Sequence, residues 1–278
     1  MAAEFLDRSE QVTAPGGETF EVLGRAGPVR LTRAPRVAAE ASEELLVVKQ
    51  GRIFVCSGPN GDIHPGRATG EGVYADDTRY LSEFRLRIGG KVPVPLSSSA
   101  DRAYEAYVDL TNPELDDRAP GVPQTTLHVR RERLVDERLY ERIEVSNYGH
   151  ERARTGLKLT VGADFADMFE VRGARKRIAR GHVLAPKRSK AGVIFGYVGE
   201  DKLFRQTFID ADPPPEIDVG EEGATLRWDI DLQPREVFAV TITVEASLQG
   251  ERSLPRPMEV ALETASDWPR NGATRARI

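Results

Sequence analysis

The sequence predicts an all-β protein, a large antiparallel β-sandwich with one short C-terminal helix. Three observations support this fold class. Apolar and polar residues alternate with a period of two in several segments, glycine-rich and asparagine-rich turn signals separate these segments, and no alternation of strand and helix is visible. The chain has 278 residues, of which 40% are hydrophobic, and this is enough to bury a sizeable core in one large β domain or two small ones.

The first 44 residues predict a partly ordered leader. They are rich in Gly, Pro, Ala and Glu and have no sustained periodicity. The short apolar stretch of Phe20, Val22 and Leu23 predicts one early strand. We expect the β-sandwich domain to span residues 45–250, and residues 251–278 to form a C-terminal helix and tail.

Four segments of the sandwich domain show the strand pattern most clearly. Phe84, Leu86 and Ile88 alternate with charged residues, which places the apolar side chains on one face of a strand. The same alternation recurs in residues 157–161, 226–232 and 238–244. Turn signals occur at residues 59–62, 89–90 and 147–149. Strands with one polar face are typical of antiparallel sheets.

A single amphipathic helix is expected near the C-terminus. Pro257 suits the first turn of a helix, and apolar residues follow it on one side. The helix should end near Trp268, because the residue before Pro269 is pushed out of the helical region.

Composition excludes several classes of protein. No segment reaches the roughly 18 apolar residues that a membrane span needs, and the N-terminus lacks a signal-peptide pattern. The single cysteine, Cys56, requires no oxidising compartment, so a cytoplasmic location is expected. A net charge of −5 argues against a nucleic-acid partner. Residues 172–190 carry eight basic and no acidic side chains, which favours a solvated surface over a phosphate site.

Motif searches reveal no catalytic or metal-binding signature. The sequence has no nucleophile elbow, HExxH motif or glycine-rich nucleotide loop, and its four histidines lack ligand spacing. We therefore expect no metal, no cofactor and no catalytic residue in this chain. Hydrolysis of a glycosidic bond would need two carboxylates that face each other across a cleft. The candidate groups are Asp76 with Asp77, and Asp164 with Asp167 and Glu170. In an extended segment Asp76 and Asp77 point to opposite faces and cannot act as such a pair. For Asp164 and Asp167, capping of backbone N–H groups in a turn or short helical stretch is the favoured role.

Three segments together resemble a known family. They are VYADDTRYLSEFRLRIGG at residues 73–90 with PLSSS at residues 95–99, AYVDLTNPEL at residues 106–115, and GADFADMFEVRG at residues 162–173. These segments resemble the N-terminal β-domain of bacterial glycogen-debranching-enzyme-like proteins, which are related to amylo-α-1,6-glucosidases. The resemblance extends over roughly residues 45–248, and the third segment is its most specific part.

The resemblance implies a β-sandwich of the supersandwich kind, followed by a larger (α/α) barrel that carries the catalytic carboxylates. No catalytic residue of that barrel falls within this chain. The residues that the resemblance marks as binding or domain-interface candidates are Asp77, Arg79, Asp164, Asp167, Phe169, Glu170 and Arg172. Since Asp77 and Arg79 are two residues apart in an expected strand, they could pair or brace a loop. Phe165, Met168 and Phe169 are expected to be buried anchors. For the acidic and basic residues, structural bracing, a barrel interface and sugar contact remain open.

Three functions follow, in decreasing order of support. The leading one is a non-catalytic accessory domain that packs on an (α/α) barrel, in cis or in trans, and shapes its cleft; it predicts an exposed apolar patch that includes the helix near Trp268. The second is a stand-alone α-glucan-binding module, which requires solvent-facing aromatic side chains. The tyrosines that could supply them are Tyr74, Tyr80, Tyr104, Tyr107, Tyr140, Tyr148 and Tyr197, whereas Trp228 is expected in the core. The third is a self-contained glycoside hydrolase or epimerase.

Overall fold

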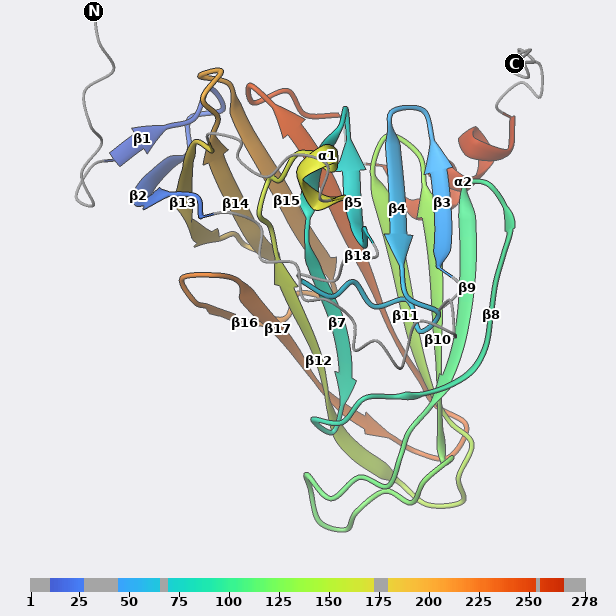
Figure 1. Cartoon of the computed structure of the whole chain (residues 1–278). Helices are drawn as coiled ribbons and strands as arrows, with labels where there is room; N and C mark the ends of the chain where they lie inside the picture. The colour runs from blue at the N-terminus through green and yellow to red at the C-terminus, as the bar shows by residue number, and fades with distance from the viewer. Residues whose placement is uncertain (1–10, 28–44, 66–69, 173–179, 254–255, 268–278) are drawn as a thin grey trace, which may run out of the picture.

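A computed structural model of the chain describes residues 11–27, 45–65, 70–172, 180–253 and 256–267. These residues form 18 strands in three sheets and two helices, and neighbouring strands pair antiparallel throughout. The predicted all-β antiparallel fold is therefore confirmed. Figure 1 shows the long sheet at the back, with the two shorter sheets lying against one side of it.

The largest sheet has ten strands. In spatial order these are β1 (Gln11–Thr13), β2 (Thr19–Arg25), β13 (His182–Arg188), β14 (Gly192–Val198), β15 (Phe204–Asp212), β18 (Val237–Leu248), β11 (Leu139–Asn147), β10 (Leu127–Val135), β9 (Glu105–Thr111) and β8 (Val94–Arg102). The strand expected around Phe20 is β2, which pairs with β13 and so extends one end of this sheet. The rest of the expected leader, residues 1–10 and 28–44, lies outside the described residues.

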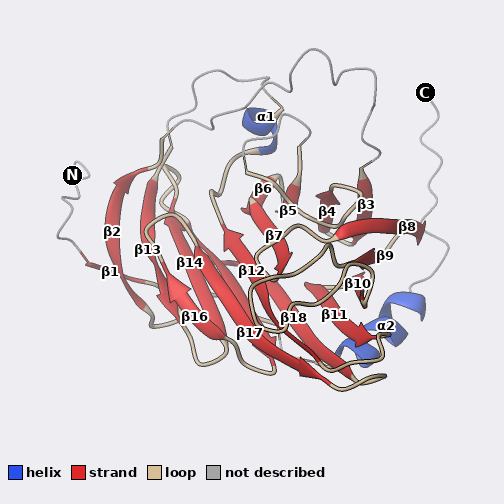
Figure 2. Cartoon of the chain, turned by 90° about the horizontal axis from the view of Figure 1, so that it is seen from below, coloured by secondary structure: helices blue, strands red, loops and turns tan. Residues whose placement is uncertain are grey.

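Two four-stranded sheets cover the inner face of the large sheet. The first contains β16 (Glu216–Val219), β17 (Ala224–Leu232), β12 (Ala153–Gly162) and β7 (Glu83–Ile88). The second contains β3 (Leu46–Gln50), β4 (Ile53–Ser57), β5 (Gly72–Ala75) and β6 (Thr78–Leu81). Seen from below in Figure 2, both short sheets lie on the same side of the long one.

One connected apolar core holds the three sheets together. Val129 and Val240 come from the large sheet, Leu159 from the first small sheet, and Val55 and Val73 from the second, and all of them are buried. The period-two pattern of the sequence explains this core, because alternate residues of each strand point to the same face. All four segments in which we expected strands lie within β7, β12, β17 and β18, and Trp228 is buried as predicted.

A cluster of buried charges joins the second small sheet to the large one. Glu141 on β11 accepts hydrogen bonds from Arg131 Nε at 2.5 Å and from Arg133 Nε at 2.6 Å. Arg131 also contacts Asp62 at 2.7 Å. Burial disfavours the charged form of Arg131, but the two carboxylates outweigh it and the pKa of the guanidinium is raised. Buried charges of this kind require such pairing, so the cluster fixes the relative positions of the two sheets.

The C-terminal helix α2 (Met258–Asp267) lies where the sequence predicts it. Ala261 and Ala265 are buried against Leu134 and Tyr140, so its apolar face is covered, and only Val260 is a largely exposed apolar side chain on it. An exposed apolar patch centred on this helix was therefore a wrong expectation for its described residues, and Trp268 lies outside them. Exposed apolar side chains occur instead on and just before the edge strand β8, at Val92, Val94 and Leu96.

Candidate functional site

The two segments most specific to the family resemblance lie next to each other in the fold. Arg79 N donates to Ala166 O and Met168 N donates to Asp77 O, each at 2.8 Å, and Thr78 forms an antiparallel bridge with Asp167. The segment after β12 therefore runs along β6 before α1 (Met168–Val171) begins. As a result, residues 73–90 and 162–172 form one structural unit.

A bidentate ion pair closes this unit. Arg79 Nε donates to Asp164 Oδ1 at 3.0 Å and Arg79 Nη2 donates to Asp164 Oδ2 at 2.5 Å. The Arg79 side chain is only 1% exposed, and its Nη1 donates to the carbonyl of Glu71 at 3.2 Å. Burial lowers the pKa of Arg79, but the neighbouring carboxylate of Asp164 outweighs burial and the pKa is raised. We call this pair the Arg79–Asp164 brace.

Of the two roles left open for Asp77 and Arg79, the described residues show no pairing between them, and Arg79 instead braces the loop after β12 through Asp164. Asp76 and Asp77 form the turn between β5 and β6, with φ of 45° and 64°, so Asp77 is not part of an extended strand. Both side chains are exposed, and Asp76 accepts a hydrogen bond from Arg52 at 2.6 Å. Residues with left-handed backbone angles do not show the alternation of side chains between two faces that a strand has, and the possible pairing of Asp77 with Arg79 depended on that alternation.

The remaining acidic candidates organise α1. Asp167 is its N-cap, and its Oδ1 accepts from Phe169 N at 2.8 Å. Asp164 Oδ1 also accepts from Ala166 N at 3.3 Å, so both aspartates bind backbone N–H groups, one of the roles that the sequence left open. Glu170 is buried and lies 3.6 Å from Arg180 Nε, whereas Arg172 is the exposed C-cap residue.

The apolar residues of the same segment differ in burial from our expectation. Phe165 is buried, and it stacks on Tyr197 with a ring separation of 5.4 Å. Phe169 is not a buried anchor, because its side chain is 45% exposed. The helix has only four residues, and it turns Glu170 and Val171 inward in place of Phe169.

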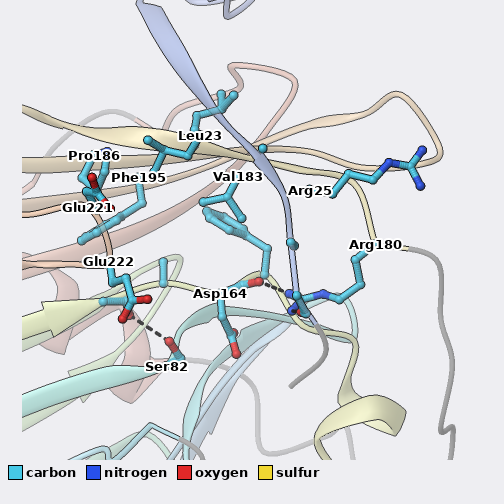
Figure 3. A pocket seen from close by; sticks show the side chains of 18 of the residues that line it. Leu23, Arg25, Ser82, Asp164, Arg180, Val183, Pro186, Phe195, Glu221 and Glu222 are labelled. Atoms are coloured by element: carbon cyan, nitrogen blue, oxygen red, sulfur yellow. Dashed lines mark hydrogen bonds between the residues drawn. The ribbon is translucent and has the colours of Figure 1, made fainter. Parts of the chain in front are cut away.

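A large cavity of about 600 Å³ lies between the first part of the large sheet and the end of the first small sheet. Its apolar side includes Val183 from β13 and Phe195 from β14, which face the first small sheet. Its polar wall is formed by Ser82 and Glu83 at the start of β7, by Asp164 after β12, and by Glu221 and Glu222 in the β16–β17 turn. Figure 3 shows Ser82, Phe195, Glu221 and Glu222 around one open space, with Asp164 and Arg180 on the side nearest α1.

A small cavity of about 190 Å³ lies on the other side of the same wall. Asp167 and Glu170 line it, together with Asp201 and Arg205 from β15 and the preceding turn. Phe165 and Arg180 line both cavities and separate them. The Arg180 side chain is fixed there, since it donates to Gly27 O at 2.7 Å and to the carbonyl of Asp164. The sequence alone did not identify Arg180, which appeared only as one member of a basic run.

The tyrosines do not form a single exposed aromatic platform. Tyr74, Tyr80, Tyr140 and Tyr197 are buried, and only Tyr148 is largely exposed, at 69%. Burial raises the pKa of Tyr74 to about 12, since the charged phenolate is disfavoured away from water. A glycan-binding surface built on all seven tyrosines is therefore a wrong expectation.

The described residues contain neither a metal-site arrangement nor a membrane-spanning helix. Within residues 11–27, 45–65, 70–172, 180–253 and 256–267, no group of three or more His, Cys, Asp or Glu side chains has the arrangement of a metal site. The two helices of the same part of the chain are too short or too polar to cross a membrane.

The chain aligns with several solved structures at low sequence identity. A protein provisionally assigned as a kojibiose phosphorylase from human microbiome aligns with a TM-score of 0.52 and 9% identity, over 94% of this chain and 36% of that one. A protein provisionally assigned as an aldose 1-epimerase from Escherichia coli K12 aligns with a TM-score of 0.42 and 9% identity, over 73% of this chain and 99% of that one. A galactose mutarotase-like protein from Lactobacillus casei aligns with a TM-score of 0.42 and 7% identity, over 73% of this chain and 100% of that one.

The fold and its braced segment define this chain as a large β-sandwich domain of the kind found in the kojibiose phosphorylase, of which it spans about a third. No curated protein sequence matches the chain. Residues 48–243 match the family described as the N-terminal domain of some glycogen debranching enzymes. This match covers most of the chain, and the chain therefore belongs to that family, as the sequence resemblance implied.

Proposed function

We propose that this chain is a non-catalytic accessory domain of a glycogen-debranching-enzyme-like glycoside hydrolase, which packs on an (α/α) barrel and forms part of the rim of its cleft. The single observation that carries the proposal is the family match over residues 48–243. The lone cysteine suits a reducing compartment such as the cytoplasm.

The environment of the candidate carboxylates supports a non-catalytic role. Glycosidic hydrolysis needs one carboxyl group that stays protonated and a second that is free to act as nucleophile or base. Asp164 instead neutralises Arg79, and Asp167 caps α1. Glu170 is buried and lies 3.6 Å from Arg180 Nε. These three side chains serve the local structure.

The α1 segment offers a docking point for the barrel. Phe169 and Arg172 are exposed on this segment, while the Arg79–Asp164 brace holds the preceding residues against β6. Aromatic and arginine side chains on rigid supports dominate the binding energy of protein interfaces. We infer that Phe169 inserts into the barrel surface.

The experiment mixes the 278-residue chain with the barrel of a family member produced without its own N-terminal domain. We expect co-elution in size-exclusion chromatography with light scattering, and no release of glucose from a branched α-glucan by the chain alone. Phe169→Ala should weaken the association at least tenfold, because a central aromatic contributes about 2 kcal/mol or more. Tyr148→Ala is the matched control, since Tyr148 is exposed but lies at the other end of β12.

Two results would contradict the proposal. Glucose release by the chain alone would show that it is an enzyme in its own right. Failure of the barrel to bind, or equal binding by Phe169→Ala and Tyr148→Ala, would remove α1 as the docking point.

The large cavity favours one second candidate function, binding of an α-glucan by the chain itself, because its volume lies within the range of about 300 to 1,000 Å³ that small-molecule sites occupy.

A further inference from the structure

The large cavity has walls of two kinds. One side is apolar, with the buried Phe195 and the partly buried Val183. Its opposite wall presents oxygen atoms, from Ser82 and Glu83 at one end and from the 28% exposed Asp164 carboxylate at the other. A pyranose ring has apolar C–H faces and a rim of hydroxyl groups, so a cavity with one apolar and one oxygen-rich wall is complementary to it.

The charge of the cavity narrows the class of ligand. Two of its carboxylates are neutralised, because Asp164 pairs with Arg79 and Glu83 accepts a hydrogen bond from Arg85 at 2.6 Å. Three others, Glu21, Glu221 and Glu222, have exposed side chains and no ion pair within the described residues.

The two arginines that line the cavity do not offset these three carboxylates. Arg25 lies 3.4 Å from Glu200, and Arg180 is bound to backbone carbonyls and lies near Glu170. Among the described residues that line it, the cavity therefore has an excess of negative charge, which repels a phosphate group, and its carboxylates accept hydrogen bonds from hydroxyl groups.

We propose that this cavity binds a neutral, hydroxyl-rich sugar, the end of an α-glucan chain, and excludes phosphorylated sugars. The wall residue Asp164 belongs to the segment that leads into α1, so a chain end held here lies close to the docking point for the barrel. The inference rests on the proposed function for the choice of an α-glucan as the sugar.

The experiment measures binding of maltotriose and of glucose 1-phosphate to the 278-residue chain by saturation-transfer NMR and calorimetry. Maltotriose should bind, and glucose 1-phosphate should bind at least tenfold more weakly. Val183→Trp, which adds a bulky side chain to the apolar side of the cavity, should weaken maltotriose binding at least tenfold, with circular dichroism confirming the fold. Absence of maltotriose binding, or equal affinity for the two sugars, would overturn the proposal, and so would unchanged binding by a folded Val183→Trp variant.

A charge reversal tests the same cavity without disturbing the core. Glu221 and Glu222 are exposed, so the double variant Glu221→Arg/Glu222→Arg should fold normally. We expect it to raise the affinity for glucose 1-phosphate at least fivefold, because two negative charges become two positive ones. Glu216→Arg is the matched control on the same hairpin outside the cavity, and it should leave both affinities unchanged.

The two proposals fail in different ways. If the cavity does not bind sugar, association of the chain with the barrel through Phe169 is unaffected. If the accessory role is wrong, the barrel fails to bind while maltotriose binding persists. An effect of Glu216→Arg equal to that of the double reversal would show that net charge, and not the cavity, determines the affinity.

Discussion

The Arg79–Asp164 brace should dominate the stability of the segment that leads into α1. Asp164→Asn removes the charge that balances Arg79, a side chain with 1% exposure. Removing one partner of a buried ion pair costs roughly 3 to 5 kcal/mol. Because the Asp164 side chain is 28% exposed and an asparagine oxygen still accepts one hydrogen bond, we expect the lower limit, about 3 kcal/mol.

Urea unfolding followed by tryptophan fluorescence, to which the buried Trp228 contributes, measures this cost. With a slope of about 3 kcal/mol per molar urea, the midpoint should fall by about 1 M. The control is Asp231→Asn, which breaks a bidentate pair with Arg152 at 2.5 and 2.6 Å on the exposed surface. This variant should leave the midpoint unchanged, because water solvates both partners.

A double variant distinguishes the loss of the ion-pair attraction from the cost of leaving Arg79 buried without its carboxylate. In Arg79→Met/Asp164→Asn no charge remains buried, so the double variant should be more stable than Asp164→Asn alone. The reasoning is refuted if Asp164→Asn costs less than about 1 kcal/mol, which is within the range of a surface pair. It is also refuted if Asp231→Asn shifts the midpoint by the same amount.

Three other predictions concern the remaining buried or capping groups. Glu141→Gln should cost about 4 kcal/mol in urea unfolding, because Arg131 and Arg133 both lose their buried carboxylate, and a cost below about 1 kcal/mol would contradict this. Asp167→Ala should cost about 1 kcal/mol locally and speed amide hydrogen exchange at Phe169, whereas Asp167→Asn, which can still cap, should not; equal exchange rates would exclude the cap. Burial raises the pKa of the Cys56 thiol from 9.0 to about 11. The Cys56 thiol of the folded protein therefore keeps its proton between pH 9 and 11 while that of the unfolded chain loses it, so the free energy of unfolding should fall by roughly 2 to 3 kcal/mol at most as pH rises through this window. Cys56→Ala should flatten that decline, and a pH profile unchanged from wild type would contradict the assignment.

Strands and the terminal helix could be predicted because their apolar residues recur within a few positions of one another. The positions of the buried charged residues could not be predicted in this way. Arg131 and Arg133 occupy the same face of β10 as Val129 and Val135, which the alternation assigns to the core. They are tolerated there because Glu141 on the next strand and Asp62, 69 residues earlier in the chain than Arg131, meet them. Periodicity identifies the buried face, but it carries no information about such distant partners.

The contacts among the candidate site residues could not be predicted from the sequence. The motif residues were identified, but the two halves of the brace are 85 positions apart, and no local pattern pairs them. Phe169 was misplaced because a helix of four residues is too short for a 3.6-residue periodicity to indicate which side faces inward. Arg180 carries no signal in the sequence other than its membership of a basic run, although it separates the two cavities.

Asp164 connects the two proposals, and this gives a final prediction. Its carboxylate lines the large cavity, and its pairing with Arg79 holds the residues before α1. Asp164→Asn should therefore weaken maltotriose binding and barrel association together, under conditions where the variant remains folded. Phe169→Ala should weaken only the association, because Phe169 does not line the cavity. If Asp164→Asn changes neither affinity, the brace supports the fold alone, and the cavity and the docking point act independently of it.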